Sequence, residues 1–176
     1  TNQVFNNISF LGSLGSMTGD GSFNKVIFLG NGNINGNNQF NELTFSPSKI
    51  YTLEQGKTQT IVSKFESITP QCGGWSTIKS NSGGIPASIS ASNPAVIMVS
   101  GALIEDVHGI GTADFTAKNS VDNGNTTGWK FPLSTGENLY WVGGAGNWND
   151  RLHWSNSSGG AGGYCVPGPR DNTFFN

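Results

Sequence analysis

The sequence carries little charge. Charged residues make up 11% of its 176 residues, and the formal net charge is −2. Ordinary soluble domains contain about 25% charged residues. No basic run is present, so the chain lacks the electrostatic footprint of a nucleic-acid-binding protein, and we expect no nucleic acid partner. The low charge does not indicate disorder, because 11% of the residues are aromatic and such side chains need a core.

Long apolar runs are also missing. The longest, at 95–99, is far shorter than the about 18 residues of a membrane-spanning helix. The first residues have neither a basic start nor an apolar stretch, so they do not resemble a signal peptide. Because the chain starts at Thr1 without Met and stops after Asn176, we expect it to be a piece of a longer protein.

Cysteine is scarce as well. Cys72 and Cys165 lie 93 residues apart, without the close spacing of a zinc knuckle. An even cysteine count in a secreted protein favours a disulfide bond between them. Two buried free thiols are the alternative.

What the sequence does contain is a repeat. The phrase Phe-Asn-x-(Ile/Val/Leu)-x-Phe occurs at 5–10, 23–28 and 40–45, at intervals of 18 and 17 residues. A fixed recurrence on this scale is typical of stacked repeat proteins, in which one turn cannot bury its apolar face alone. The fold class that we predict is therefore all-β, and within it a parallel β-helix (β-solenoid). A β-sandwich with similar-looking edges is the alternative.

Helical periodicity is almost absent elsewhere. Strand-like runs of four to eight residues alternate with Gly, Asn, Asp, Ser and Pro, which favour turns. The predicted strands are 4–10, 23–29, 40–45, 49–53, 58–63, 75–79, 87–90, 95–99, 102–107, 113–117 and 129–131.

Side chains in a strand alternate between two faces, which places the repeated phrases in detail. The parity breaks between Phe5 and Ile8, so we expect a bend or bulge at Asn6-Asn7, after which Ile8 and Phe10 share a face. Stacked copies would form aliphatic and aromatic ladders about 4.8 Å apart. In the same register, Asn6, Asn24 and Asn41 would form a hydrogen-bonded Asn ladder.

The end of the chain has a different composition. Residues 138–176 are dense in Trp and Gly, and Pro132 and Ser134-Thr135-Gly136 before them indicate a linker. We therefore expect a repeat module at 1–133. Residues 134–176 would be a linker followed by an end cap or the opening of the next module.

Two stretches resemble a known family. Residues 106–111 and 117–129 resemble a module ending of the form Ala-x-Asn-Ser-x-Asp-x-Gly-Asn-x-x-Gly-Trp. Residues 141–155, which read Trp-Val-Gly-Gly-x-Gly-Asn-Trp-x-Asp-x-x-His-Trp-Ser, are similar to a module opening in the same proteins. These are the giant repetitive surface proteins of Bacteroidetes, including the SprB-like adhesins of gliding motility.

The resemblance implies a parallel β-helix that is exported by type 9 secretion and displayed outside the cell at the outer membrane. It also implies adhesion to surfaces or polysaccharide during gliding motility. The implied partners are neighbouring modules of the same chain, polysaccharide or an abiotic surface, and the secretion and gliding machinery. The resemblance gives no ligand-binding residues, so candidate sites come from the residues themselves.

Two candidate binding sites follow from residue type. The five tryptophans could offer flat apolar platforms to sugars; they are Trp75, Trp129, Trp141, Trp148 and Trp154. A cap over the end of the β-helix is the alternative for the last three. Asp122, Asn123 and Asn125 carry the oxygen ligands that calcium prefers, and a plain tight turn is the alternative there.

We predict no enzymatic activity, but two polar groups deserve comparison with catalytic sites. Glu105, Asp106, His108 and Asp114 form the densest polar cluster, and two carboxyls about 5–10 Å apart could cleave polysaccharide. Turn-capping acids are the alternative. Asp150, His153 and Asp171 lack a serine in a nucleophile elbow, so a structural histidine packed among tryptophans is the better interpretation. A non-binding spacer is a further alternative for the whole chain.

Overall fold

The computed structural model describes residues 4–68, 72, 74–133, 135–168 and 170–175. The chain forms two compact units: unit 1 contains Thr1–Thr69 and Trp75–Pro132, and unit 2 contains Pro70–Gly74 and Leu133–Asn176. Strands account for 51% of the residues and helix for 2%, so the predicted all-β class is confirmed. Residues 70–74, which the sequence-based division placed in the first module, belong to unit 2. None of the described helices is long and apolar enough to span a membrane.

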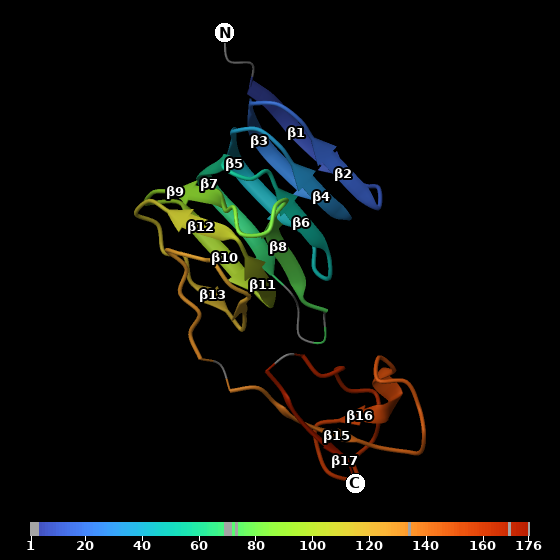
Figure 1. Cartoon of the computed structure of the whole chain (residues 1–176). Helices are drawn as coiled ribbons and strands as arrows, with labels where there is room; N and C mark the ends of the chain where they lie inside the picture. Colours follow the sequence, from blue (N-terminus) through green and yellow to red (C-terminus); the bar gives the residue numbers. More distant parts are fainter. Residues whose placement is uncertain (1–3, 69–71, 73, 134, 169, 176) are drawn as a thin grey trace. The chain divides into compact units, whose positions relative to one another are not determined.

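Unit 1 consists of two parallel sheets, here named sheet A and sheet B (Figure 1). The path of sheet A is β1 (Val4–Phe10), β3 (Gly21–Phe28), β5 (Asn38–Phe45), β7 (Thr58–Ile68), β10 (Val96–Ser100) and β13 (Ala117–Lys118), with β9 (Ala87–Ala91) and β12 (Val107–Ile110) joined to it through β7. The order in sheet B is β2 (Leu14–Met17), β4 (Asn31–Ile34), β6 (Ile50–Leu53), β8 (Ser76–Ser80), β11 (Ala102–Glu105) and β14 (Val121–Asp122).

The chain visits the two sheets in turn, and each visit to both makes one circuit. The three repeated phrases lie in β1, β3 and β5 and pair in register, with Phe5 opposite Phe23 and Phe23 opposite Phe40. The interval of 17 or 18 residues is therefore the length of one circuit. The predicted parallel, in-register pairing of the phrases is confirmed.

Aromatic rings fill the space between the sheets. Val26 and Phe28 of β3 lie directly opposite Leu43 and Phe45 of β5, and all four are buried. Ring centroids are 4.5 Å apart for Phe10 and Phe28, and 5.9 Å apart for Phe28 and Phe45. These ring contacts form the aromatic ladder that the repeat predicts.

Sheet B supplies small residues where sheet A supplies rings. A Cβ atom on Gly32 would lie 2.8 Å from the ring of Phe28 and 3.0 Å from that of Tyr51, so only glycine fits there. Tyr51 stacks on Phe45 with a centroid distance of 3.7 Å, and its hydroxyl donates to the Ser46 carbonyl at 2.9 Å. Burial raises the pKa of Tyr51 to about 12, which keeps this hydroxyl protonated at neutral pH.

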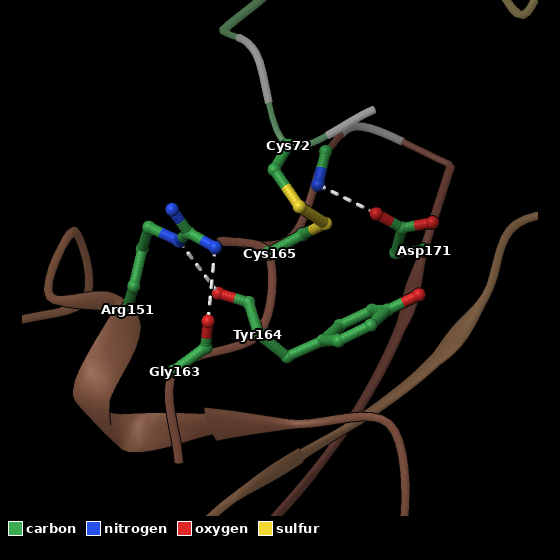
Figure 2. The surroundings of a disulfide bond; sticks show 7 residues. Cys72, Arg151, Gly163, Tyr164, Cys165 and Asp171 are labelled. Atoms are coloured by element: carbon green, nitrogen blue, oxygen red, sulfur yellow. Dashed lines mark hydrogen bonds between the residues drawn. A yellow bond between two sulfur atoms is a disulfide. The ribbon is translucent and has the colours of Figure 1, made fainter. Parts of the chain in front are cut away.

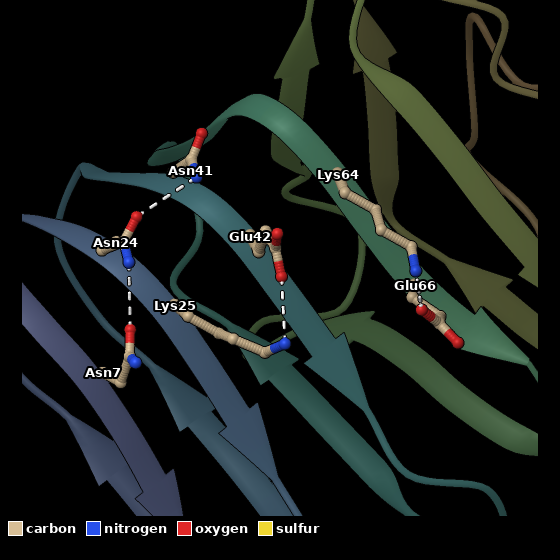
Figure 3. Close-up of polar contacts among 7 residues, drawn as sticks. All are labelled: Asn7, Asn24, Lys25, Asn41, Glu42, Lys64 and Glu66. Atoms are coloured by element: carbon tan, nitrogen blue, oxygen red, sulfur yellow. Dashed lines mark hydrogen bonds and ion pairs between the residues drawn. The ribbon is translucent and has the colours of Figure 1, made fainter.

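The outer face of sheet A carries an Asn ladder that is displaced from the predicted one (Figure 3). Asn24 Nδ2 donates to Asn7 Oδ1 at 3.0 Å, and Asn41 Nδ2 donates to Asn24 Oδ1 at 3.2 Å. The first member is thus Asn7, and the prediction of Asn6 was wrong. The register passes from Phe5 directly to Asn7, so the irregularity expected at Asn6-Asn7 moves the presented side chain by one residue.

The last circuit of unit 1 is closed by a tryptophan. Trp129 is 9% exposed, and its ring meets that of Phe115 edge-on at 5.1 Å. The backbone of Lys130 exchanges hydrogen bonds with Ala117 and Phe115. Of the strand predicted at 129–131, only an isolated bridge between Lys130 and Thr116 forms.

Candidate functional site

Unit 2 is built on a three-stranded sheet in the order β16–β15–β17. The strands are β15 (Asn138–Trp141), β16 (Trp154–Ser155) and β17 (Asn172–Phe175), with a short 3-10 helix, η1 (Arg151–His153), before β16. β15 pairs antiparallel with β16 and parallel with β17. Three segments that are distant in the sequence therefore meet in one small sheet.

Strand alternation separates the aromatic residues of this sheet into two faces. Trp141 lies opposite Trp154 and Phe175, whereas Tyr140 lies opposite Phe174. The Tyr140 and Phe174 rings stack on each other with centroids 5.1 Å apart. The face that carries Trp141 is much larger, because Trp148 from the preceding loop adds to it.

We name Trp141, Trp148, Trp154 and Phe175 the aromatic face. Trp154 is fully buried and meets Trp141 at 5.2 Å and Trp148 at 4.8 Å, both edge-on. Trp148 and Phe175 are 44% and 66% exposed, with centroids 6.4 Å apart. A buried tryptophan thus supports two exposed aromatic rings, which is the arrangement of a rigid apolar platform.

The loop before η1 fixes the position of Trp148. The His153 imidazole stacks on Trp141 at 4.5 Å with an interplanar angle of 5°. A Cβ atom on Gly146 would lie 2.0 Å from His153 Nε2, so glycine is required where the loop crosses the ring. Trp154 Nε1 donates to the Trp148 carbonyl at 2.8 Å, which anchors the exposed residue to the buried one.

The remaining polar residues of this motif also hold turns. Asn147 Oδ1 accepts from the amide of Asn149, and Asp150 Oδ1 accepts from the amide of Leu152 as the N-cap of η1. Arg151 donates from Nε to the Tyr164 carbonyl at 3.0 Å and from Nη2 to the Gly163 carbonyl at 2.9 Å (Figure 2). The motif is therefore a set of structural contacts beneath the aromatic face.

The group Asp150, His153 and Asp171 is not arranged as a catalytic triad. His153 Nδ1 lies 3.0 Å from the Val142 carbonyl oxygen. Asp171 accepts hydrogen bonds from the amides of Glu137 and Gly168. Each of the three residues is thus engaged with backbone groups of its own surroundings.

Cys72 and Cys165 form a disulfide bond within unit 2 (Figure 2). Their Cα atoms are 4.5 Å apart, and the bond spans 93 residues of sequence. Cys165 is buried and follows Tyr164, whose carbonyl Arg151 binds. The disulfide therefore attaches the segment around Cys72 to the part of unit 2 that also carries η1.

The structure separates the five candidate tryptophans by exposure. Trp154 is buried in unit 2 and Trp129 is buried in unit 1, so neither offers a face to a ligand. Trp75 and Trp141 are partly exposed, and Trp148 is the most exposed of the five. Sequence reasoning missed Phe175, although the adjacent pair Phe174-Phe175 in a short strand must place one ring on each face.

The residues of the candidate calcium loop make turn contacts. Asp122 Oδ1 accepts from the Gly124 amide at 2.9 Å, which forms a tight turn. Asn123 donates to Glu105 Oε2, and Asn125 donates to Asp106 Oδ1. Within the described part of the chain, no group of three or more His, Cys, Asp or Glu is arranged to hold a metal ion. These contacts favour the turn over the calcium site.

The predicted polar cluster splits into two separate hydrogen-bonded acids. Asp106 is buried and accepts from Asn125 Nδ2 at 2.6 Å and from the Gly84 amide at 3.0 Å, which lowers its pKa. Hydrogen bonds from Lys130 and Thr116 lower the pKa of Asp114. An acid–base pair for glycoside cleavage needs one carboxyl with a raised pKa, and neither residue has one.

Asp106 gives a pH prediction for unit 1. A carboxyl whose pKa is lower in the folded state stabilises the fold above its unfolded pKa of about 3.9, and this contribution is lost as pH falls through the folded value. We expect Asp106→Asn to destabilise unit 1 at pH 7 and to flatten the loss of stability on acidification below about pH 4. Urea melts of both proteins from pH 7 to pH 2 measure the effect. Parallel curves would contradict it.

No family model, characterised protein or solved structure matches the chain. The functional argument therefore depends on the residues of this chain. Its strongest single element is the aromatic face, because it combines exposure with a rigid and buried support.

Proposed function

We propose that unit 1 is a parallel β-helix. The support for this proposal is the alternation of the chain between sheets A and B, with parallel pairing throughout both. The continuous ring contacts from Phe10 through Phe28 to Phe45 agree with it. In such a stack each circuit is stabilised chiefly by its neighbours, which suits a long, rigid and repetitive body.

We further propose that the chain is a structural and adhesive repeat of a very large adhesin at the bacterial cell surface. It would be exported by type 9 secretion and would support attachment during gliding motility. The module-ending and module-opening motifs at 117–129 and 141–155 support this proposal. The low charge and the abundance of Asn, Ser, Thr and Gly agree with an extracellular β-protein.

Adhesion in this proposal is assigned to the aromatic face of unit 2. The observation that carries it is the exposure of Trp148 and Phe175, at 44% and 66%, above a fully buried Trp154. The C–H-rich faces of pyranose rings are apolar and bury area against flat aromatic rings. Residues that anchor such contacts contribute about 2 kcal/mol or more to binding. Polysaccharide is therefore the ligand class that this surface suits.

The test is retention of the purified chain on immobilised polysaccharides, such as cellulose, chitin and dextran, with and without calcium. We expect binding to at least one of them and a loss of about tenfold or more in affinity in Trp148→Ala, which corresponds to about 1.4 kcal/mol. The contacts around Asp122 predict that chelation of calcium leaves binding unchanged.

Phe174→Ala is the matched control. Phe174 is 42% exposed and neighbours Phe175 in β17, but it stacks on Tyr140 on the opposite face. Its replacement should leave retention unchanged. If the chain binds none of the polysaccharides, or if Phe174→Ala weakens binding and Trp148→Ala does not, adhesion through the aromatic face is wrong.

A further inference from the structure

A polar pocket lies on the outer face of sheet B, in unit 1. Thr52 of β6 lies opposite Lys79 of β8, and Lys79 lies opposite Glu105 of β11. These residues line a cavity of about 300 Å³ together with Ser80, Asn81, Gly83 and Asp106. We name it the Lys79 pocket. It is built by the in-register column of three strands and by the turn that follows β8.

Several polar groups of this pocket are unused. With the described residues, the Lys79 ammonium and the Thr52 hydroxyl make no hydrogen bond or ion pair. Asn81 uses its Oδ1 to accept from the Gln55 amide at 2.9 Å, and Glu105 uses Oε2 to accept from Asn123 at 2.9 Å. This leaves the Asn81 amide hydrogens and Glu105 Oε1 for a ligand.

The outer face of sheet A treats similar side chains differently. There Lys25 pairs with Glu42 in the register position opposite it, at 3.1 Å (Figure 3). Lys79 and Glu105 are also register neighbours, but no ion pair joins them. The two charged groups instead line a pocket with room between its walls.

We propose that the Lys79 pocket binds a single uncharged hexose unit of a polysaccharide. A cavity of about 300 Å³ is at the small end of ligand-binding pockets, which suits one sugar ring. Hydroxyl groups both donate and accept, so a ring with neighbouring hydroxyls can use the donors of Lys79 and the acceptor of Glu105 together.

The charge of the pocket selects against acidic sugars. One ammonium faces the two carboxylates of Glu105 and Asp106, and the lowered pKa keeps Asp106 ionised at neutral pH. The pocket therefore carries a net negative charge and repels uronates and sulfated sugars. This site goes beyond the proposed function, because it lies in unit 1 and shares no residue with the aromatic face.

The experiment is a backbone amide NMR titration of the whole chain with cellohexaose, laminarihexaose, mannohexaose and polygalacturonate. We expect saturable shifts at Thr52, Lys79, Asn81 and Glu105 with at least one neutral oligosaccharide and none with polygalacturonate. Lys79→Met should weaken this binding about tenfold or more. Lys25→Met, which removes the same charge from sheet A, should leave it unchanged.

Two further variants keep the two sites distinct. Trp148→Ala should abolish shifts in unit 2 and leave those at the Lys79 pocket, so failure of one proposal does not decide the other. Glu105→Gln removes an acceptor without removing volume, and it should weaken binding even if Lys79→Met proves unstable. The proposal is overturned if these four amides do not shift, if they shift most with polygalacturonate, or if neither pocket variant changes the affinity.

Discussion

Replacing Phe28 with alanine should lower the free energy of unfolding of unit 1 by about 3–5 kcal/mol. Phe28 is fully buried, lies between Phe10 and Phe45, and also meets the edge of Tyr51. Its removal therefore leaves a cavity in the middle of the aromatic ladder, and Gly32 opposite it has no side chain to fill the space. Denaturant melts of the variant and the parent chain measure the loss.

Leu14→Ala is the control for Phe28→Ala. Leu14 also lies in a strand of unit 1, but it is 59% exposed, and replacements at such positions usually change stability by less than about 0.5 kcal/mol. A loss below 1 kcal/mol for Phe28→Ala would contradict the ladder as a source of stability. A loss of similar size for both variants would indicate that the two circuits contribute equally at their surfaces and in their interior.

The repeated phrases predicted the first circuits well for a simple reason. Each phrase places an apolar residue and an aromatic residue two positions apart, and a constant interval brings these pairs into register. The all-β class, the parallel pairing and the buried positions of Val26, Phe28 and Leu43 follow from that pattern. The exact Asn of the outer ladder does not, because it depends on a local irregularity beside Asn6.

Beyond the third phrase the circuits become longer, and the periodic signal disappears. Thr52, Lys79 and Glu105 lie opposite one another, although 27 and 26 residues separate them in the sequence. Each long circuit holds an additional strand, β9 or β12, and a turn of its own. The register that assembles the Lys79 pocket is therefore a property of the folded sheets, and no short motif encodes it.

The aromatic face could be predicted only in part. Tryptophan content drew attention to Trp148 and Trp154, but the difference in their exposure arises from the pairing of β15 with both β16 and β17. That pairing joins residues about 14 and 34 positions apart along the chain. The contribution of Phe175 becomes visible only once the parallel β15–β17 register is known.

Removal of the disulfide bond should destabilise unit 2 by about 4 kcal/mol. The chain-entropy model gives a value near this for a closed loop of this size, and the bond between Cys72 and Cys165 spans 93 residues. Unit 2 contains only about 50 residues. Units of this size have small cores and often depend on covalent staples for stability.

The measurement is hydrogen–deuterium exchange of the chain with Cys72→Ser and Cys165→Ser together, compared with the parent chain under oxidising and reducing conditions. Amides of β15 and β17 should lose protection by about two to three orders of magnitude in the double variant, because about 1.4 kcal/mol corresponds to a factor of ten. Amides of β3 and β5, which belong to unit 1, serve as the internal control and should keep their protection.

The two ways of removing the bond must agree for this argument to hold. The reduced parent chain and the double variant share the loss of the loop constraint but differ in their side chains, so matching exchange in β15 and β17 identifies the constraint itself. Arg151 retains its bonds to the Tyr164 and Gly163 carbonyls in both, but these contacts lie at the surface and contribute little once the loop is open. Unchanged protection in unit 2 after reduction would show that the aromatic cluster alone holds this unit. The exposed Trp148 and Phe175 would then remain presented to a ligand in reducing as well as oxidising surroundings.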